Sequence, residues 1–174
     1  RKFLRYLLSS NMGEVLTIFL GVVGAGVLGL QTDGATLVLP LLATQILWIN
    51  LLTDSWPAMA MGVDPQADDV MARPPRRADQ RVIDARMWAG VVQTGLMMAA
   101  ATLLTIDLFL PGGLIEGAHD IDTARTAGFT VLVFAQLFNC LSARSALTSA
   151  FHRPFVNLWL WAAIGLSTLL QVAV

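Results

Sequence analysis

Apolar residues dominate five stretches of the chain, at residues 4–30, 37–63, 87–110, 126–142 and 155–174. Each stretch is close to the ~17–25 residues that a helix needs to cross the hydrocarbon core of a bilayer. Shorter polar connectors separate the stretches, and only the connector at residues 64–86 is both long and highly charged. The pattern predicts an all-α fold, a polytopic membrane bundle of five transmembrane helices.

Composition supports a lipid environment and excludes several other classes of protein. Hydrophobic residues make up 56% of the chain and charged residues 13%, against roughly 25% charged residues in a soluble domain. The net charge of −1 gives no indication of a nucleic-acid partner. A single cysteine, Cys140, excludes a disulfide framework and a cysteine-rich metal site. The expected partner is therefore the lipid bilayer.

The distribution of basic residues predicts how the chain is oriented in the membrane. Lysine and arginine in short loops are retained on the cytoplasmic side. If the N-terminus is cytoplasmic, ten of the 11 basic residues lie on that side and Arg125 alone lies on the other. We therefore expect an integral, multi-pass membrane protein whose N-terminus and 64–86 loop are cytoplasmic.

Two carboxylates lie deep inside the predicted spans. Glu14 and Asp54 each carry a cost of at least ~2.5–3.5 kcal/mol at the centre of a bilayer, so each is a candidate functional residue. Asn11 lies three residues before Glu14, and Asn50 lies three residues before Thr53 and four before Asp54. Residues at these helical spacings share a face, so each helix is expected to present a group of oxygen atoms.

These polar groups are expected to meet at one depth in the membrane. Counting ~1.5 Å per residue from the predicted cytoplasmic boundaries puts Glu14, Asp54 and Gln136 at roughly 12–14 Å, near the middle of the core. Pro57 provides no N–H for the Thr53 carbonyl, so the second span should be kinked or unwound near Asp54–Pro57. Carboxylate, amide and hydroxyl oxygens without thiolate or imidazole suit Ca²⁺ or an alkali ion.

Polar residues within spans can also serve only to hydrogen-bond one helix to another. This is the interpretation that we adopt for Asn139 and Asn157. For Glu14 together with Asp54, a cation site is the favoured interpretation.

Several segments resemble a known family. Five segments are similar to P-type Ca²⁺-transporting ATPases of the endoplasmic-reticulum type. They are SSNMGEVLTIFLG at 9–21, QILWINLLTDSWPAMAMGVDP at 45–65, VMARPPR at 70–76, QLFN at 136–139 and VNLW at 156–159. The resemblance extends over nearly all of the chain, and it implies that residues 1–174 are a C-terminal transmembrane fragment that contains spans five to nine of a ten-span pump. It implies calcium ligands at Asn11, Glu14, Asn50, Thr53 and Asp54.

The same resemblance implies which parts of such a pump lie outside this sequence. No DKTGT phosphorylation motif is present, so no catalytic or cofactor-binding residue is expected here. The cytoplasmic domains that use ATP and Mg²⁺, and spans one to four and ten, would be partners of this region. ATP hydrolysis is therefore expected only of a full-length Ca²⁺-transporting ATPase, and Ca²⁺ is the transported ion.

Two further expectations follow from the resemblance. Gln136 matches a position where the two-ion pumps of the endoplasmic reticulum have glutamate, so we expect an oxygen ligand there with one charge fewer and one Ca²⁺ per ATP. The 64–86 loop, with Arg76 and Arg77, is expected to dock a cytoplasmic domain. The alternatives are another cation pump of the Na⁺, K⁺ or H⁺ type, a secondary transporter or channel, and a structural membrane domain without an ion site.

Overall fold

The computed structural model describes residues 2–28, 30–32, 36–37, 39–63, 83–110, 114, 117, 120–143 and 157–173. Its helices are α1 (Lys2–Val23), α2 (Ala43–Trp48), the π-helix η1 (Ile49–Thr53), α3 (Ser55–Gly62), α4 (Ala85–Phe109), α5 (Ile121–Ala143) and α6 (Leu158–Ala173). Two-residue strands, β1 (Gln31–Thr32) and β2 (Thr36–Leu37), pair antiparallel. The expected all-α membrane bundle is confirmed, apart from this short pairing.

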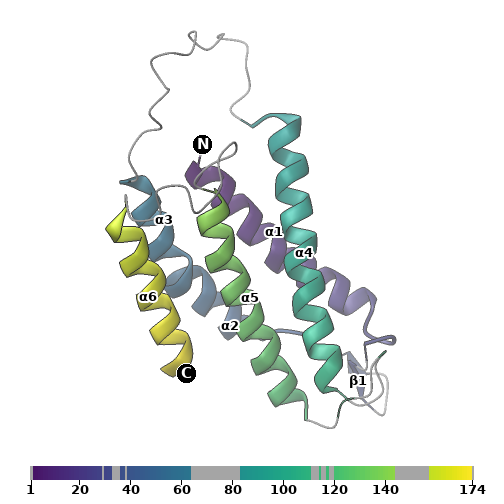
Figure 1. Ribbon diagram of the computed structural model, residues 1–174. Coiled ribbons are helices and arrows are strands. Elements are labelled where there is room, and N and C mark those ends of the chain that lie inside the picture. The colour runs from purple at the N-terminus through teal and green to yellow at the C-terminus, as the bar shows by residue number, and fades with distance from the viewer. Residues whose placement is uncertain are drawn as a thin grey trace.

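The helices form an elongated bundle. In Figure 1, α4 and α5 run side by side, α1 crosses them obliquely, and α3 lies beside α6 at one edge. Within the described residues, α1, α4 and α5 are each long and apolar enough to cross a membrane, and α6 is a shorter apolar helix of 16 residues. The chain from α2 through η1 to α3 forms a further, broken helical segment.

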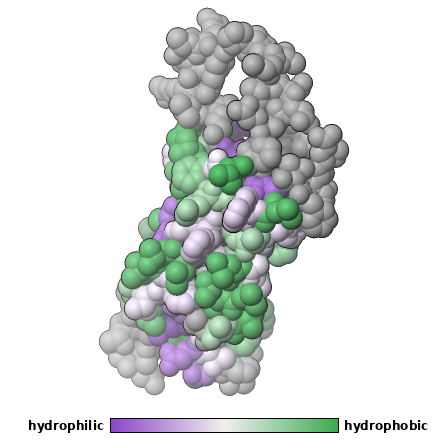
Figure 2. Space-filling view, turned by 90° about the vertical axis from the view of Figure 1, so that its left-hand side faces the viewer, coloured by the Kyte–Doolittle hydropathy of each residue, from purple (hydrophilic) through white to green (hydrophobic). Residues whose placement is uncertain are grey.

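The side chains are arranged as expected for a bundle surrounded by lipid. The buried face of α1 is made of small and polar residues, namely Tyr6, Ser9, Ser10, Gly13, Glu14, Thr17 and Gly21. Its exposed face carries large apolar residues such as Val15, Phe19 and Val23, and Figure 2 shows hydrophobic side chains spread over the described surface on the side it presents. Lipid tails are as apolar as the side chains, so no hydrophobic effect drives helices together in a membrane. Contacts between such helices are therefore enriched in small and polar residues.

Glycines allow α4 to approach its neighbours closely. A Cβ atom added at Gly95 would lie 2.7 Å from Met12 Cγ on α1. A Cβ atom added at Gly128 on α5 would lie 2.5 Å from Ile106 Cγ1 on α4. Both distances are shorter than real Cβ contacts, so these two glycines set the spacing of α1, α4 and α5.

The irregularity expected near Asp54–Pro57 begins before the proline. The Asp54 N–H donates to the Ile49 carbonyl at 2.8 Å, five residues back, and this bond closes the wide turn of η1. Pro57 is the third residue of α3, in the first turn, where a missing N–H is tolerated. The segment is therefore widened rather than unwound. The Thr53 carbonyl, which Pro57 cannot serve, accepts from Ser167 Oγ of α6 at 3.4 Å.

Candidate cation site

Glu14 is the centre of a polar cluster between three helices. It lies in the middle of α1 with only 5% of its surface exposed. One carboxylate oxygen accepts from Asn50 Nδ2 of η1 at 2.7 Å, and the other accepts from Gln136 Nε2 of α5 at 2.9 Å. We call Glu14, Asn50 and Gln136 the Glu14 cluster. The structure thus brings together three of the six residues that the sequence indicated as ligands.

Asp54 is buried beside this cluster and has a different partner. Its Oδ1 accepts from the Tyr6 hydroxyl at 2.7 Å, which joins α1 to the start of α3. Sequence reasoning did not identify Tyr6. The available signal was its place on the small and polar stripe of α1, in which residues 6, 10, 13, 17 and 21 follow helical spacing.

Two of the buried oxygen atoms that have no hydrogen-bond partner in the described part of the chain belong to candidate ligands. They are Asp54 Oδ2 and Gln136 Oε1, on side chains that are 2% and 1% exposed. A buried acceptor without a partner costs about 1–3 kcal/mol, so the pair calls for an explanation such as an ion. A side-chain amide has both an oxygen acceptor and an NH₂ donor. Asn50 and Gln136 now donate an N–H to Glu14, and by rotating the amide each can direct its oxygen toward a cation instead.

These donors fit a hard cation. They are two carboxylates and two amides, which suit Ca²⁺ and similar ions and are poor ligands for copper or zinc. Among the described residues no group of three or more His, Cys, Asp and Glu side chains lies close enough to hold a metal. A cation bound here would therefore depend on amide, hydroxyl and main-chain oxygens in addition to Glu14 and Asp54.

The side chains of the two remaining predicted ligands bond to the main chain of their own helical segments. Thr53 is buried, and its hydroxyl donates to the Ile49 carbonyl at 2.9 Å. Asn11 is exposed and its Nδ2 donates to the Leu7 carbonyl at 2.9 Å, so it does not join the Glu14 cluster. Its position three residues before Glu14 places it to one side of the inward face, where its own helix supplies a partner.

The two asparagines assigned to helix packing do link helices. Asn139 Nδ2 of α5 donates to Ser9 Oγ of α1 at 2.7 Å. Asn157 Nδ2 donates to the Ala60 carbonyl of α3 at 2.9 Å. Both contacts are the hydrogen bonds between helical segments that this interpretation expects.

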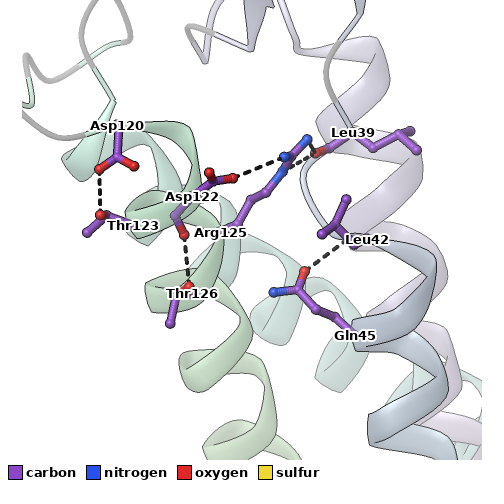
Figure 3. A network of polar contacts seen from close by, with 8 residues as sticks. All are labelled: Leu39, Leu42, Gln45, Asp120, Asp122, Thr123, Arg125 and Thr126. Atoms are coloured by element: carbon purple, nitrogen blue, oxygen red, sulfur yellow. Dashed lines mark hydrogen bonds and ion pairs between the residues drawn. The ribbon is translucent and has the colours of Figure 1, made fainter. Parts of the chain in front are cut away.

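A second polar network ties α5 to the segment that enters α2 (Figure 3). Arg125 Nε and Nη2 both donate to the Leu39 carbonyl, at 3.1 and 3.0 Å, and Nη1 lies 3.7 Å from Asp122 Oδ1. At the start of α2, the Leu42 N–H donates to Gln45 Oε1 at 2.9 Å. From the sequence, Arg125 stands out only as the basic residue predicted to lie opposite the others.

Comparisons with known proteins agree on one family. The family described as "Cation transporting ATPase, C-terminus" matches residues 38–174. Over all of this chain, a calcium-transporting ATPase of Bacillus subtilis is 39% identical, calcium-transporting ATPase 1 of Yarrowia lipolytica 33%, and the endoplasmic-reticulum-type calcium-transporting ATPase 3 of Arabidopsis thaliana 31%. The chain covers only 18%, 17% and 19% of these relatives. It belongs to the family of cation transporting ATPase C-terminal regions.

Proposed function

We propose that this chain is the membrane part of an ATP-driven calcium pump and supplies oxygen ligands to Ca²⁺ as the ion crosses the membrane. The observation that carries the proposal is the Glu14 cluster: a buried carboxylate between three helices, with unpartnered oxygens on Gln136 and on nearby Asp54. The names of the relatives support Ca²⁺ as the ion.

The proposed ligands are Asn11, Glu14, Asn50, Thr53, Asp54 and Gln136. Glu14 and Asp54 supply two negative charges, which match one Ca²⁺. When the ion enters, the amides of Asn50 and Gln136 exchange an N–H donated to Glu14 for an oxygen directed at the ion. Asn11 has to leave its bond to the Leu7 carbonyl before it contributes.

The placement of the chain in the pump is also proposed. The chain is an integral membrane protein, as its apolar helices and its family indicate. It corresponds to spans five to nine of ten, with the N-terminus and the 64–86 loop in the cytoplasm. ATP and Mg²⁺ bind in cytoplasmic domains outside this sequence. The 64–86 loop, with Arg76 and Arg77, falls almost entirely outside the described residues.

The test is Ca²⁺ uptake by the full-length protein in sealed vesicles. Glu14→Gln and Asp54→Asn should each remove a charged ligand. Loss of a residue that only hydrogen-bonds to a metal ligand lowers metal affinity 10–100-fold, so loss of a ligand itself should lower Ca²⁺ affinity by at least that factor. Asp107→Asn is the matched control. Asp107 is also a buried carboxylate within a predicted span, but it lies near the end of α4 and accepts from the Leu114 N–H at 2.8 Å.

Three results would contradict the proposal. Uptake that continues without ATP and in the presence of vanadate would indicate a secondary transporter. ATP-driven transport of another cation, with no Ca²⁺ uptake, would indicate a different pump. Unchanged Ca²⁺ transport in the Glu14 and Asp54 variants would indicate a structural membrane domain.

A further inference from the structure

Tyr6 has a fixed position inside the bundle. Its side chain is completely buried. The ring packs in an apolar cluster contributed by α3, α5 and α6, which consists of Ala58, Ala60, Met61, Cys140, Ala143, Leu160 and Ala163. Packing from three other helices leaves the ring little freedom, so the direction of its hydroxyl group is set by the fold.

The hydroxyl of Tyr6 acts on one oxygen of Asp54. It donates to Oδ1 at 2.7 Å, a length typical of a strong bond from a hydroxyl to a carboxylate. The main chain of Asp54 is held on both sides, because its N–H donates to the Ile49 carbonyl at 2.8 Å and its carbonyl accepts from the Ala58 N–H at 3.0 Å. Only the side-chain torsions of Asp54 remain free, and the bond from Tyr6 fixes them.

The two oxygens of Asp54 are therefore not equivalent. Oδ1 is occupied by Tyr6, whereas Oδ2 is buried without a partner among the described residues. We infer that Tyr6 is a positioning residue of the cation site, which holds Oδ1 so that Oδ2 is the oxygen that Asp54 offers to the cation. This inference rests on the function proposed above.

The expected contribution follows from how metal sites use their outer contacts. A carboxylate ligand is itself hydrogen-bonded in most metal sites, and removing such an outer partner costs 10–100-fold in metal affinity. Here the partner comes from α1, 48 residues away from Asp54. The Tyr6 bond also connects the helix that carries Glu14 to the carboxylate on the broken helix, so the two charged ligands are oriented together.

The experiment compares Tyr6→Phe with the wild-type full-length pump. The variant keeps the ring and its packing and removes only the hydroxyl. Equilibrium ⁴⁵Ca binding in detergent without ATP should show a loss of Ca²⁺ affinity of about tenfold or more. Without Ca²⁺, the variant should lose no more unfolding free energy than a single unpartnered buried acceptor costs, since the ring still fills its site.

The matched control is Thr102→Val, which removes another completely buried hydroxyl, on α4, that has no hydrogen-bond partner in the described chain. It should bind Ca²⁺ as the wild type does. Equal affinity in Tyr6→Phe and the wild type, or a Tyr6→Phe variant that does not fold, would overturn the inference, because the hydroxyl would then serve only the fold. A wild-type pump that binds no Ca²⁺ would instead overturn the proposed function.

Discussion

Gln136→Glu is the substitution that best tests how many ions the site holds. Gln136 Nε2 donates to Glu14 Oε1 at 2.9 Å, so the neutral amide stabilises the carboxylate of Glu14 when no cation is bound. A glutamate at this position replaces that donor with a second carboxylate. When both carboxylates are ionised, the cation-free site contains two negative charges in contact, and this repulsion favours either a shared proton or a bound cation.

The magnitude can be estimated from the observed separation. Two unit charges at 2.9 Å repel each other by about 6 kcal/mol at an effective dielectric constant of about 20, and by about 3 kcal/mol if the side chains move apart to ~6 Å. A divalent cation between the carboxylates turns this repulsion into attraction. The substitution should therefore destabilise the cation-free protein and favour binding of an additional Ca²⁺.

The assay is equilibrium ⁴⁵Ca binding to the full-length pump, expressed per phosphorylation site. We expect one high-affinity Ca²⁺ in the wild type and two in Gln136→Glu. Gln171→Glu is the control, because Gln171 is also a buried glutamine but contacts Thr130 on α5 rather than Glu14. Two high-affinity ions in the wild type, or a single ion in Gln136→Glu, would refute this reasoning.

Three further predictions concern packing and coupling. Gly95→Ala should lower the free energy of unfolding by about 1–3 kcal/mol, because the added methyl group overpacks against α1. Gly90→Ala is the control, since a methyl group there would have no atom within 4 Å. Equal melting temperatures of the two variants would contradict the close approach of α1 and α4. Arg125→Lys should be as destabilising in thermal unfolding as Arg125→Ala, because an ammonium group lacks the two-nitrogen contact, and full rescue by lysine would contradict this. Replacing Arg76 and Arg77 together by alanine should slow Ca²⁺-activated phosphorylation at unchanged expression, and an unchanged phosphorylation rate would exclude the docking role of the loop.

Hydropathy and depth were sufficient to predict the bundle and part of the site. The thickness of a bilayer fixes how far along a span the midpoint lies, so residue counting alone put Glu14 and Gln136 at one level, and they are hydrogen-bonded. Helical spacing also placed Asn50 on the same helical segment as Asp54. The assignment of Ca²⁺ came from resemblance, because the oxygen donors alone suit several hard cations.

Other features depend on contacts that sequence order does not reveal. The proline predicted a kinked or unwound segment near Asp54–Pro57. The structure has a widened turn that ends at Asp54, where the hydroxyls of Thr53 and Ser55 donate to the main-chain carbonyls of Ile49 and Asn50 at 2.9 Å each. Tyr6 was missed because its partner lies 48 residues away. Local propensity contains no information about such pairings.

The role of α4 shows why the site cannot be reduced to its polar residues. The Glu14 cluster takes its three side chains from α1, η1 and α5, and none from α4. Yet α1 and α5 both pack closely against α4, at Gly95 and Gly128 respectively. Hydrogen bonds weaken steeply once donor and acceptor move out of line or beyond ~3.2 Å, so a shift of a few tenths of an ångström at either glycine changes the bond between Glu14 and Gln136. The apolar helix α4 thus sets the geometry of the proposed cation site, to which it contributes no proposed ligand.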